Sequence, residues 1–295
     1  MGEDLISRNW VFLGDSLTEG IGSQRVSHVS ELVDCLRADD ANSPHHRAVH
    51  HMRLREVDSQ GFDRFVKFNV AGFIDRDKQI EPALWVWNLG CEGRTIEEDF
   101  AWVPFVTNLR PECIVIFRGG LESIIRPAMI KDGSWPWWVP NSWRGYPTLD
   151  PRCYFSSTWW RKAKQSSLDK IKQGTRRKLL GLRPGKPLLD LESFTTTYAE
   201  LLRQFRPLRT RVLVLGLLPV DDRSFPGSAE YFGRVNEELK GLTDRLGVEF
   251  LDWGAHLTSL EMHRELFYRD GFHPNHRGAK TLAEILRRQL GEGVA

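Results

Sequence analysis

The chain has 295 residues, of which 41% are hydrophobic and 27% are charged, and its formal net charge is +2. These values are typical of a folded chain with a sizeable core and exclude a disordered protein, while the small net charge indicates neither a nucleic-acid nor a membrane partner. The longest apolar run, about nine residues at 212–220, is far shorter than the ~20 residues that span a bilayer, so we expect no integral membrane contact.

Short apolar runs alternate with helical patterns along most of the chain. The first run directly precedes Gly14-Asp15-Ser16, and the fourth is followed by Arg118 and then Gly119-Gly120. Apolar strands that alternate with helices predict a parallel sheet covered on both faces, with the ligand at the carboxyl ends of the strands. The predicted strands are 9–13, 65–70, 83–89, 113–117, 212–218 and 248–251, and the predicted helices include 29–38 and 96–108.

Residues 124–187 interrupt this alternation. They hold six of the 11 tryptophans, and their 14 Lys or Arg residues against three acids give a local charge of +11. We interpret the segment as an insertion at the active edge of the sheet, loop-rich at first and helical around 157–180. The whole chain 1–295 is then one domain, with the insertion as its lid or substrate-binding subdomain.

The tryptophans of the insertion allow two interpretations. Trp135, Trp137 and Trp138 lie in a loop rich in Pro and Gly and are candidate substrate contacts, since indole faces stack on sugars and cations and anchor acyl chains. The surrounding charge favours an anionic partner such as an acyl-coenzyme A, an acyl carrier protein, an acidic or phosphorylated glycan or a phosphate-bearing metabolite. Alternatively, the tryptophans form a satellite core with the charges as its solvated face. We expect no nucleic acid, because no known binding motif accompanies the charge.

Cysteine and histidine patterns predict no metal site. The four cysteines form no C-x-x-C pair, so we expect reduced thiols and no zinc site built on them. No basic segment followed by an apolar stretch opens the chain, and together these features favour a cytoplasmic protein. One cluster of histidines has no carboxylate at ligand spacing, so we expect it to lie in a solvated loop and not to bind a metal. Its members are His45, His46, His50 and His51.

Two short segments carry candidate chemistry. Ser16 follows a predicted strand on a tight turn, where a hydroxyl is exposed and a backbone N–H is free to donate, as a nucleophile requires. A serine that caps the next helix would explain the same pattern. Asp270 precedes His273 by three residues, so one turn can hold a carboxylate against an imidazole, although this pair alone is also compatible with a structural role.

Together these segments resemble the SGNH hydrolase superfamily, also called GDSL esterases and lipases. Residues 14–20 look like the nucleophile block of that family, 88–95 like its second block and 270–274 like its last block. The resemblance covers roughly 8–120 and 210–290. It implies an α/β fold, a flavodoxin-like three-layer α/β/α sandwich around a five-stranded parallel sheet, with neither a cofactor nor a metal.

The same resemblance assigns roles to individual residues. Ser16 would be the nucleophile, His273 the general base and then acid, and Asp270 the partner that orients the imidazole. The backbone N–H groups of Ser16 and Gly90 would bind the oxyanion. Leu121 falls where the family has the asparagine that donates a third hydrogen bond, and losing one such donor costs about 10²–10³ in kcat.

Three accounts of Leu121 stay open at this point. Arg118, Ser123 or a residue of the insertion replaces the missing donor, or the enzyme is slow and selective, or the site has kept only binding. An Arg118 directed into the site would also suit a substrate carboxylate or phosphate.

We therefore expect a serine esterase or acyl hydrolase of the EC 3.1 type. It would cleave an O-acyl or thioester bond through an acyl-enzyme, on an anionic or sugar-like small molecule or glycan. The alternatives are an acyltransferase with the same triad, which could take its acyl group from acyl-coenzyme A or an acyl carrier protein, and a non-catalytic module that binds a glycan or a carrier protein.

Overall fold

The computed structural model describes residues 8–20, 26–41, 49–53, 84–146, 148–153, 158–257 and 264–291. Its centre is a six-stranded sheet in the order β2-β3-β1-β4-β5-β6, and every pair of neighbouring strands is parallel. The predicted α/β class is confirmed, but the sheet has six strands where the resemblance implied five. The strands are β1 Arg8–Gly14, β2 Val49–Arg53, β3 Leu84–Asn88, β4 Cys113–Phe117, β5 Arg211–Leu215 and β6 Glu249–Leu251.

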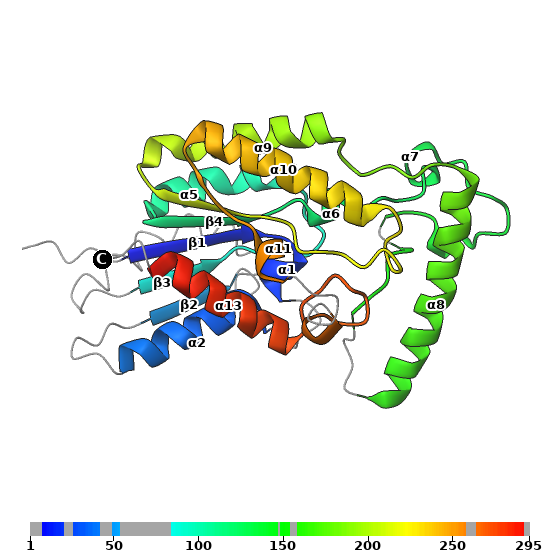
Figure 1. Ribbon diagram of the computed structural model, residues 1–295, viewed down its shortest axis with the longest axis horizontal. Helices are drawn as coiled ribbons and strands as arrows, with labels where there is room; N and C mark the ends of the chain where they lie inside the picture. The colour runs from blue at the N-terminus through cyan, green and yellow to red at the C-terminus, as the bar shows by residue number, and fades with distance from the viewer. Residues whose placement is uncertain are drawn as a thin grey trace, which may run out of the picture.

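Helices cover both faces of the sheet and make the three layers of a sandwich (Figure 1). One layer holds α5 Val103–Leu109, α9 Leu191–Phe205 and α10 Ser228–Leu246, and the other holds α2 His28–Ala41 and α13 His276–Gly291. All five residues of β3 and of β4 are buried, because a central strand of such a sheet has no solvent-facing side. That burial is why the strands could be found as apolar runs.

The extra strand β2 lies at the edge of the sheet beside β3. It contains His50 and His51, so the predicted solvated loop is wrong for these two histidines. The ring of His50 stacks on Trp85 of β3 with centroids 4.3 Å apart, which supplies the apolar contact that its polarity does not suggest. The predicted strand at 65–70, together with His45 and His46, lies outside the described residues.

The insertion contains α7 Met129–Asp132, a short 3₁₀ turn Asn141–Trp143 and the long helix α8 Trp159–Leu182, which confirms the helix predicted around 157–180. Helix α8 runs across the end of the sheet, whereas the covering helices run alongside the strands (Figure 1). Arg126 and Lys186 exchange two backbone hydrogen bonds where the chain leaves the sheet and returns to it. The insertion is therefore closed at its base.

A small second core fills the insertion. Met129, Val139, Leu149 and Leu179 are buried together, and the tryptophans that pack against them are Trp135, Trp138 and Trp143. The satellite-core interpretation is thus confirmed for these three residues. Trp137 differs, since 90% of it is exposed, and Trp159 and Trp160 at the start of α8 are exposed and stack on each other.

Buried charges hold the insertion against the α/β body. The Asp150 carboxylate accepts hydrogen bonds from Arg126 (2.9 Å) and Arg176 (2.6 Å), and both guanidinium groups are almost fully buried. Arg126 also donates to the backbone oxygens of Leu121 and Ile124, and Arg176 donates to that of Ile125. The insertion thereby fixes the backbone segment that follows β4.

Candidate active site

A tight turn at the carboxyl end of β1 positions Ser16. Asp15 caps the short helix α1, Ser16–Glu19, by accepting a hydrogen bond from the Leu17 N–H at 2.9 Å. A Cβ on Gly14 would lie 1.9 Å from the Thr18 hydroxyl, so only glycine fits immediately before this turn. Ser16 stands at the first position of α1, where a helix leaves its backbone N–H groups without intrahelical partners.

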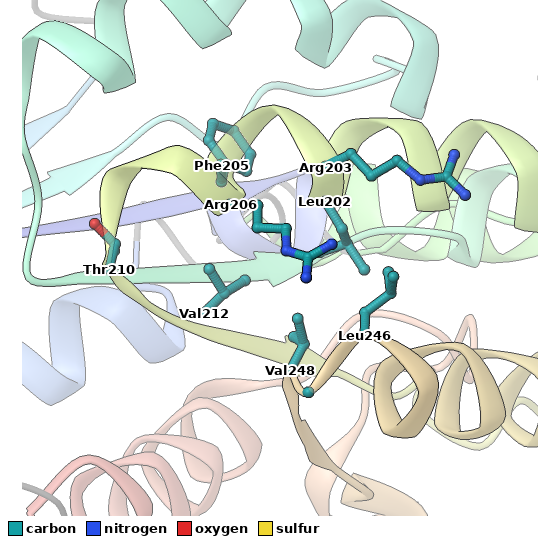
Figure 2. A pocket seen from close by; sticks show the side chains of 9 residues that line it. Leu202, Arg203, Phe205, Arg206, Thr210, Val212, Leu246 and Val248 are labelled. Carbon is teal, nitrogen blue, oxygen red and sulfur yellow. The ribbon is translucent and has the colours of Figure 1, made fainter.

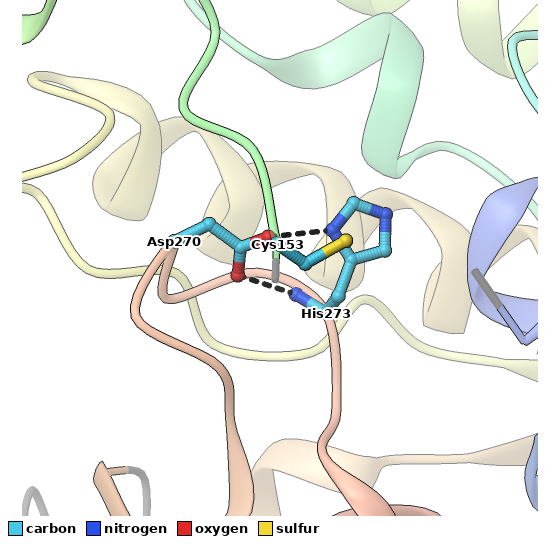
Figure 3. A group of neighbouring side chains, drawn as sticks. All are labelled: Cys153, Asp270 and His273. Carbon is cyan, nitrogen blue, oxygen red and sulfur yellow. Dashed lines mark hydrogen bonds and ion pairs between the residues drawn. The ribbon is translucent and has the colours of Figure 1, made fainter. Parts of the chain in front are cut away.

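The structure brings Ser16, His273 and Asp270 into one hydrogen-bonded chain. Ser16 Oγ lies 2.8 Å from His273 Nε2. His273 Nδ1 lies 2.8 Å from Asp270 Oδ2, and Figure 3 draws this second pair. The other oxygen of Asp270 accepts from the backbone N–H groups of Phe272 and His273, both at 3.0 Å. With Nδ1 protonated and donating to the carboxylate, Nε2 is left to accept a hydrogen bond from the Ser16 hydroxyl.

Electrostatics at this chain favour a charged imidazole. Burial by itself would lower the pKa of His273, but the charge and hydrogen bond of Asp270, together with Cys153, raise that pKa well above its usual value. The imidazolium that would form when His273 takes a proton is therefore stabilised in place.

Cys153 was not found from the sequence as a site residue. It comes from the insertion and is fully buried, and its sulfur lies with a ring nitrogen of His273 and a carboxylate oxygen of Asp270 in a group whose atoms are all within 4.8 Å of one another (Figure 3). The Cys153 carbonyl accepts a hydrogen bond from Gln165 of α8 at 2.7 Å. No sequence signal links this lone cysteine to a histidine 120 positions later.

Gly90 has a different place from the one expected. Its N–H donates to the Asn88 side chain at 2.9 Å, and a Cβ on Gly90 would lie 2.4 Å from the backbone nitrogen of Glu19. Gly90 therefore allows the segment after β3 to approach α1 closely, and its N–H is already occupied. The expectation that this N–H binds the oxyanion is not met in this geometry.

Arg118 is not a substrate contact. Its guanidinium is buried and forms an ion pair with Asp99 through two hydrogen bonds, of 2.6 and 2.5 Å, while Nη1 donates to the Arg94 carbonyl. Arg118 was predicted to meet an anionic group of the substrate. Its positive charge is instead neutralised by Asp99, which is buried in the 3₁₀ helix Ile96–Trp102. These contacts also remove Arg118 as a replacement oxyanion donor.

Leu121 lies on α6, Gly120–Ser123, directly after β4. Its neighbour Glu122 is fully buried, and one carboxylate oxygen accepts from the Ile96 N–H at 2.6 Å while the other has no partner in the described part of the chain. Burial raises the pKa of Glu122 to about 7. Glu122 thus ties α6 to the segment after β3, and Leu121 brings no polar side chain to α6.

One face of α8 carries a polar stripe toward the body of the protein. Its members recur at helical spacing and are Gln165, Asp169, Lys172 and Arg176. Gln165 at one end contacts Cys153, which lies beside His273, and Arg176 at the other end contacts the segment after α6. Lys172, between them, is 7% exposed, and the Asp169 and Asp150 carboxylates act on its charge without a hydrogen-bonded ion pair among the described residues. Burial lowers the pKa of this ammonium group.

A pocket of about 130 Å³ lies away from these residues (Figure 2). It is found at the amino ends of β5 and β6, whereas Ser16 follows the carboxyl end of β1 in the same parallel sheet. It is therefore not part of the candidate active site. Its lining consists of Leu202, Arg203, Phe205, Arg206, Thr210, Val212, Leu246, Gly247 and Val248.

A buried serine after the first strand, joined to a histidine and an aspartate at the carboxyl edge of a parallel sheet, is an arrangement of α/β ester hydrolases. The sequence profile of the GDSL-like lipase/acylhydrolase family matches residues 12–281. The chain belongs to this family, as the three sequence blocks predicted. No curated protein matches the chain by sequence.

Solved structures with the same fold include two acetylxylan esterases. Axe2 from Geobacillus stearothermophilus is 15% identical, with a TM-score of 0.52 over 98% of this chain and 97% of that one. The acetyl xylan esterase AlAXEase is 14% identical, with a TM-score of 0.52 over 97% of this chain and 100% of the other. LAE5, an α/β hydrolase from the metagenome of Lake Arreo in Spain, is 14% identical, with a TM-score of 0.51 over 98% of both chains.

None of the helices in the described segments combines the length and the apolar character that a transmembrane span needs.

Proposed function

We propose that this protein is a serine esterase that works through an acyl-enzyme, with Ser16 as nucleophile, His273 as general base and acid, and Asp270 as the group that orients the imidazole. The proposal rests on the unbroken hydrogen-bonded chain from Ser16 through His273 to Asp270, with both links at 2.8 Å. Membership of a family of ester hydrolases supports it.

The chemistry follows from the places of these atoms. Nε2 of His273 takes the Ser16 proton as Oγ attacks the ester carbonyl, and the carboxylate of Asp270 stabilises the imidazolium. The Ser16 N–H donates to the oxyanion. The imidazolium then gives its proton to the leaving alcohol. In the second half of the reaction, His273 takes a proton from the water molecule that attacks the acyl-enzyme and gives it to Ser16 Oγ as the acid leaves. Since Leu121 offers no third donor, we expect slower turnover than an intact oxyanion hole would give.

The substrate that we propose is a sugar-like ester with an anionic group. The acetylxylan esterases among the structural neighbours make an O-acetyl ester of a sugar the first class to test. Trp137, almost fully exposed on the insertion, offers an indole face to a sugar ring. Lys172 lies on the α8 face that contacts Cys153, and although the Asp169 and Asp150 carboxylates act on its charge it forms no hydrogen-bonded ion pair with either, so its ammonium group suits a substrate carboxylate or phosphate.

Kinetics of two variants test the catalytic assignment. With 4-nitrophenyl acetate as substrate, Ser16→Ala should lower kcat/KM by about 10⁴ or more, as expected when a triad nucleophile is removed. Ser193→Ala, which removes an exposed serine hydroxyl at the start of α9, is the matched control and should retain at least half of the activity. Undiminished turnover by Ser16→Ala would remove Ser16 from the mechanism.

A pair of substrates tests the anionic group. For a 4-nitrophenyl ester of a dicarboxylic acid, Lys172→Gln should raise KM about tenfold, which is ~1.4 kcal/mol, with no change for the neutral acetate ester. The matched control is Lys170→Gln, because Lys170 is exposed on the same helix. Equal effects of Lys172→Gln on the charged and the neutral ester would contradict a role in anion recognition.

A further inference from the structure

The side chains of Cys153, Asp270 and His273 lie close enough together to bind a metal ion, which the proposed esterase mechanism does not require. We propose that these three side chains form a binding site for Zn²⁺, and that the bound ion inhibits the enzyme. The binding part stands on the geometry of the cluster alone, whereas the inhibition part rests on the proposed function.

The donor set is the one that zinc prefers. A thiolate, an imidazole nitrogen and a carboxylate oxygen are its three usual protein ligands, and three of them with water in the fourth position make an open site. Hard cations such as Mg²⁺ and Ca²⁺ take oxygen ligands, so the sulfur and nitrogen favour a borderline metal. Of the described residues, these are the ones that meet as a group of at least three such ligands.

The distances fit the ion after small side-chain movements. All three donor atoms lie within 4.8 Å of one another, and the Nδ1 and Oδ2 atoms are 2.8 Å apart. Ligands of a tetrahedral zinc ion, at roughly 2.0–2.3 Å from the metal, are about 3.3–3.6 Å from one another. The nitrogen and oxygen must therefore separate by about half an ångström, and the sulfur, which lies within 4.8 Å of both, must approach them by at most about 1.3 Å.

Zinc on this cluster binds Nδ1, the ring nitrogen that faces Asp270, and stops the proposed reaction. The ion displaces the hydrogen bond to Asp270 and leaves the ring proton on Nε2, which then cannot accept the proton of Ser16. The buried thiol gives its proton to solvent, since the ligand is the thiolate.

The insertion is what creates this site. Cys153 is buried, and its backbone is held by Gln165 of α8, while Asp270 and His273 belong to the turn before α13. The esterase mechanism itself has no step for the thiol. The ligands are 117 and 120 positions apart in the sequence, so no spacing motif could have predicted the site.

Titration of the chelator-treated, full-length protein with Co²⁺ tests binding without any assumption about catalysis. A thiolate ligand gives Co²⁺ an ultraviolet charge-transfer band, which should saturate at one equivalent and disappear when excess Zn²⁺ is added. Cys153→Ala and Cys153→Ser should both lack the band. Cys35→Ser, which removes a half-buried thiol on α2, is the matched control and should keep it. A band of equal strength in the two Cys153 variants, or none in the wild type, would overturn the proposal.

Inhibition is then measured with 4-nitrophenyl acetate. Turnover of each protein in the presence of zinc is divided by its own turnover after chelation, so that any effect of the substitution on the reaction itself cancels. We expect the wild type and Cys35→Ser to lose at least nine-tenths of their activity at micromolar Zn²⁺, and the Cys153 variants to need at least tenfold more zinc. Equal sensitivity of all four proteins would contradict inhibition through this cluster. A wild type that binds Co²⁺ through sulfur but has no turnover after chelation would refute the proposed function and leave the metal site standing.

Discussion

The α/β body and the insertion are held together by different kinds of contact. In the body, the central strands bury apolar side chains on both faces of a parallel sheet. In the insertion, four buried apolar residues form a small core, and the Asp150 carboxylate between Arg126 and Arg176 makes the join to the body. The body places the proposed reacting groups Ser16, Asp270 and His273, and the insertion supplies what surrounds them, including Cys153 and the polar stripe of α8.

The largest expected effect concerns Asp270, one of the proposed reacting groups of the body. Asp270→Asn removes the charge that holds the His273 ring and stabilises the imidazolium, so kcat for 4-nitrophenyl acetate should fall by about 10⁴, or ~5.5 kcal/mol. Asp252→Asn, at the exposed N-cap of the short helix Trp253–His256, is the control and should leave kcat unchanged. A loss of less than tenfold in Asp270→Asn would mean that His273 works without its partner.

The next effect concerns the join between the two regions. Asp150→Ala leaves two buried guanidinium groups without their carboxylate, so the free energy of unfolding should fall by about 3–5 kcal/mol in urea denaturation. Asp132→Ala, which breaks the exposed pair with Arg183 in the same insertion, should have no measurable effect. Equal losses in the two variants would show that the buried pairs are not what fixes the insertion.

A third expected effect is a pH dependence of the free energy of unfolding that comes from a buried histidine of the body. His28, at the start of α2, is buried against Phe117 and Trp253, and burial lowers its pKa to about 4 from the ordinary 6.5. Between these values the unfolded chain binds a proton that the folded chain does not, so stability falls as the pH drops from 6.5 to 4, by about 3 kcal/mol in total.

The variant His28→Phe isolates this contribution, because a phenyl ring fills a similar space and does not titrate. Urea unfolding at several pH values should show that the difference in stability between wild type and variant changes by this amount over the window. Parallel curves for the two proteins would assign the acid sensitivity to other groups.

The smallest expected effect concerns the position on α6 where the two regions meet. Leu121→Asn should restore a donor and raise kcat about tenfold if the oxyanion hole is simply short of one hydrogen bond. Leu121→Ala makes similar room without a donor and should give no gain. A loss of activity in Leu121→Asn would favour a replacement donor elsewhere in the site.

The sequence predicted the body well for a physical reason. Central strands must be apolar on both faces, and residues after their carboxyl ends meet at one edge, so Ser16 could be placed at that edge from its position after the first strand. The family resemblance then added Asp270 and His273. The edge strand β2 was missed because it holds two polar histidines, and the stacking of His50 on Trp85 cannot be read from the sequence. The role predicted for Gly90 differs from its contacts in the structure, because a glycine can be required for the close approach of two segments as well as for an oxyanion hole.

The insertion was harder to predict because its contacts join residues far apart in the sequence. Arg118 looked free until Asp99 was found to neutralise it, and a cysteine without a motif partner gave no hint of His273. Half-buried tryptophans and exposed ones have the same sequence signature. Only the packing around Val139 and Leu179 distinguishes Trp138 from Trp137.

Covalent labelling with a fluorophosphonate, read by intact mass, tests the central claim most directly, because only an activated serine reacts readily. We predict one adduct per wild-type molecule and none on Ser16→Ala or His273→Ala, with Ser193→Ala labelled like the wild type. That result would establish that Ser16 is activated by His273. An adduct that persists on Ser16→Ala, or an unlabelled wild type, would contradict the account.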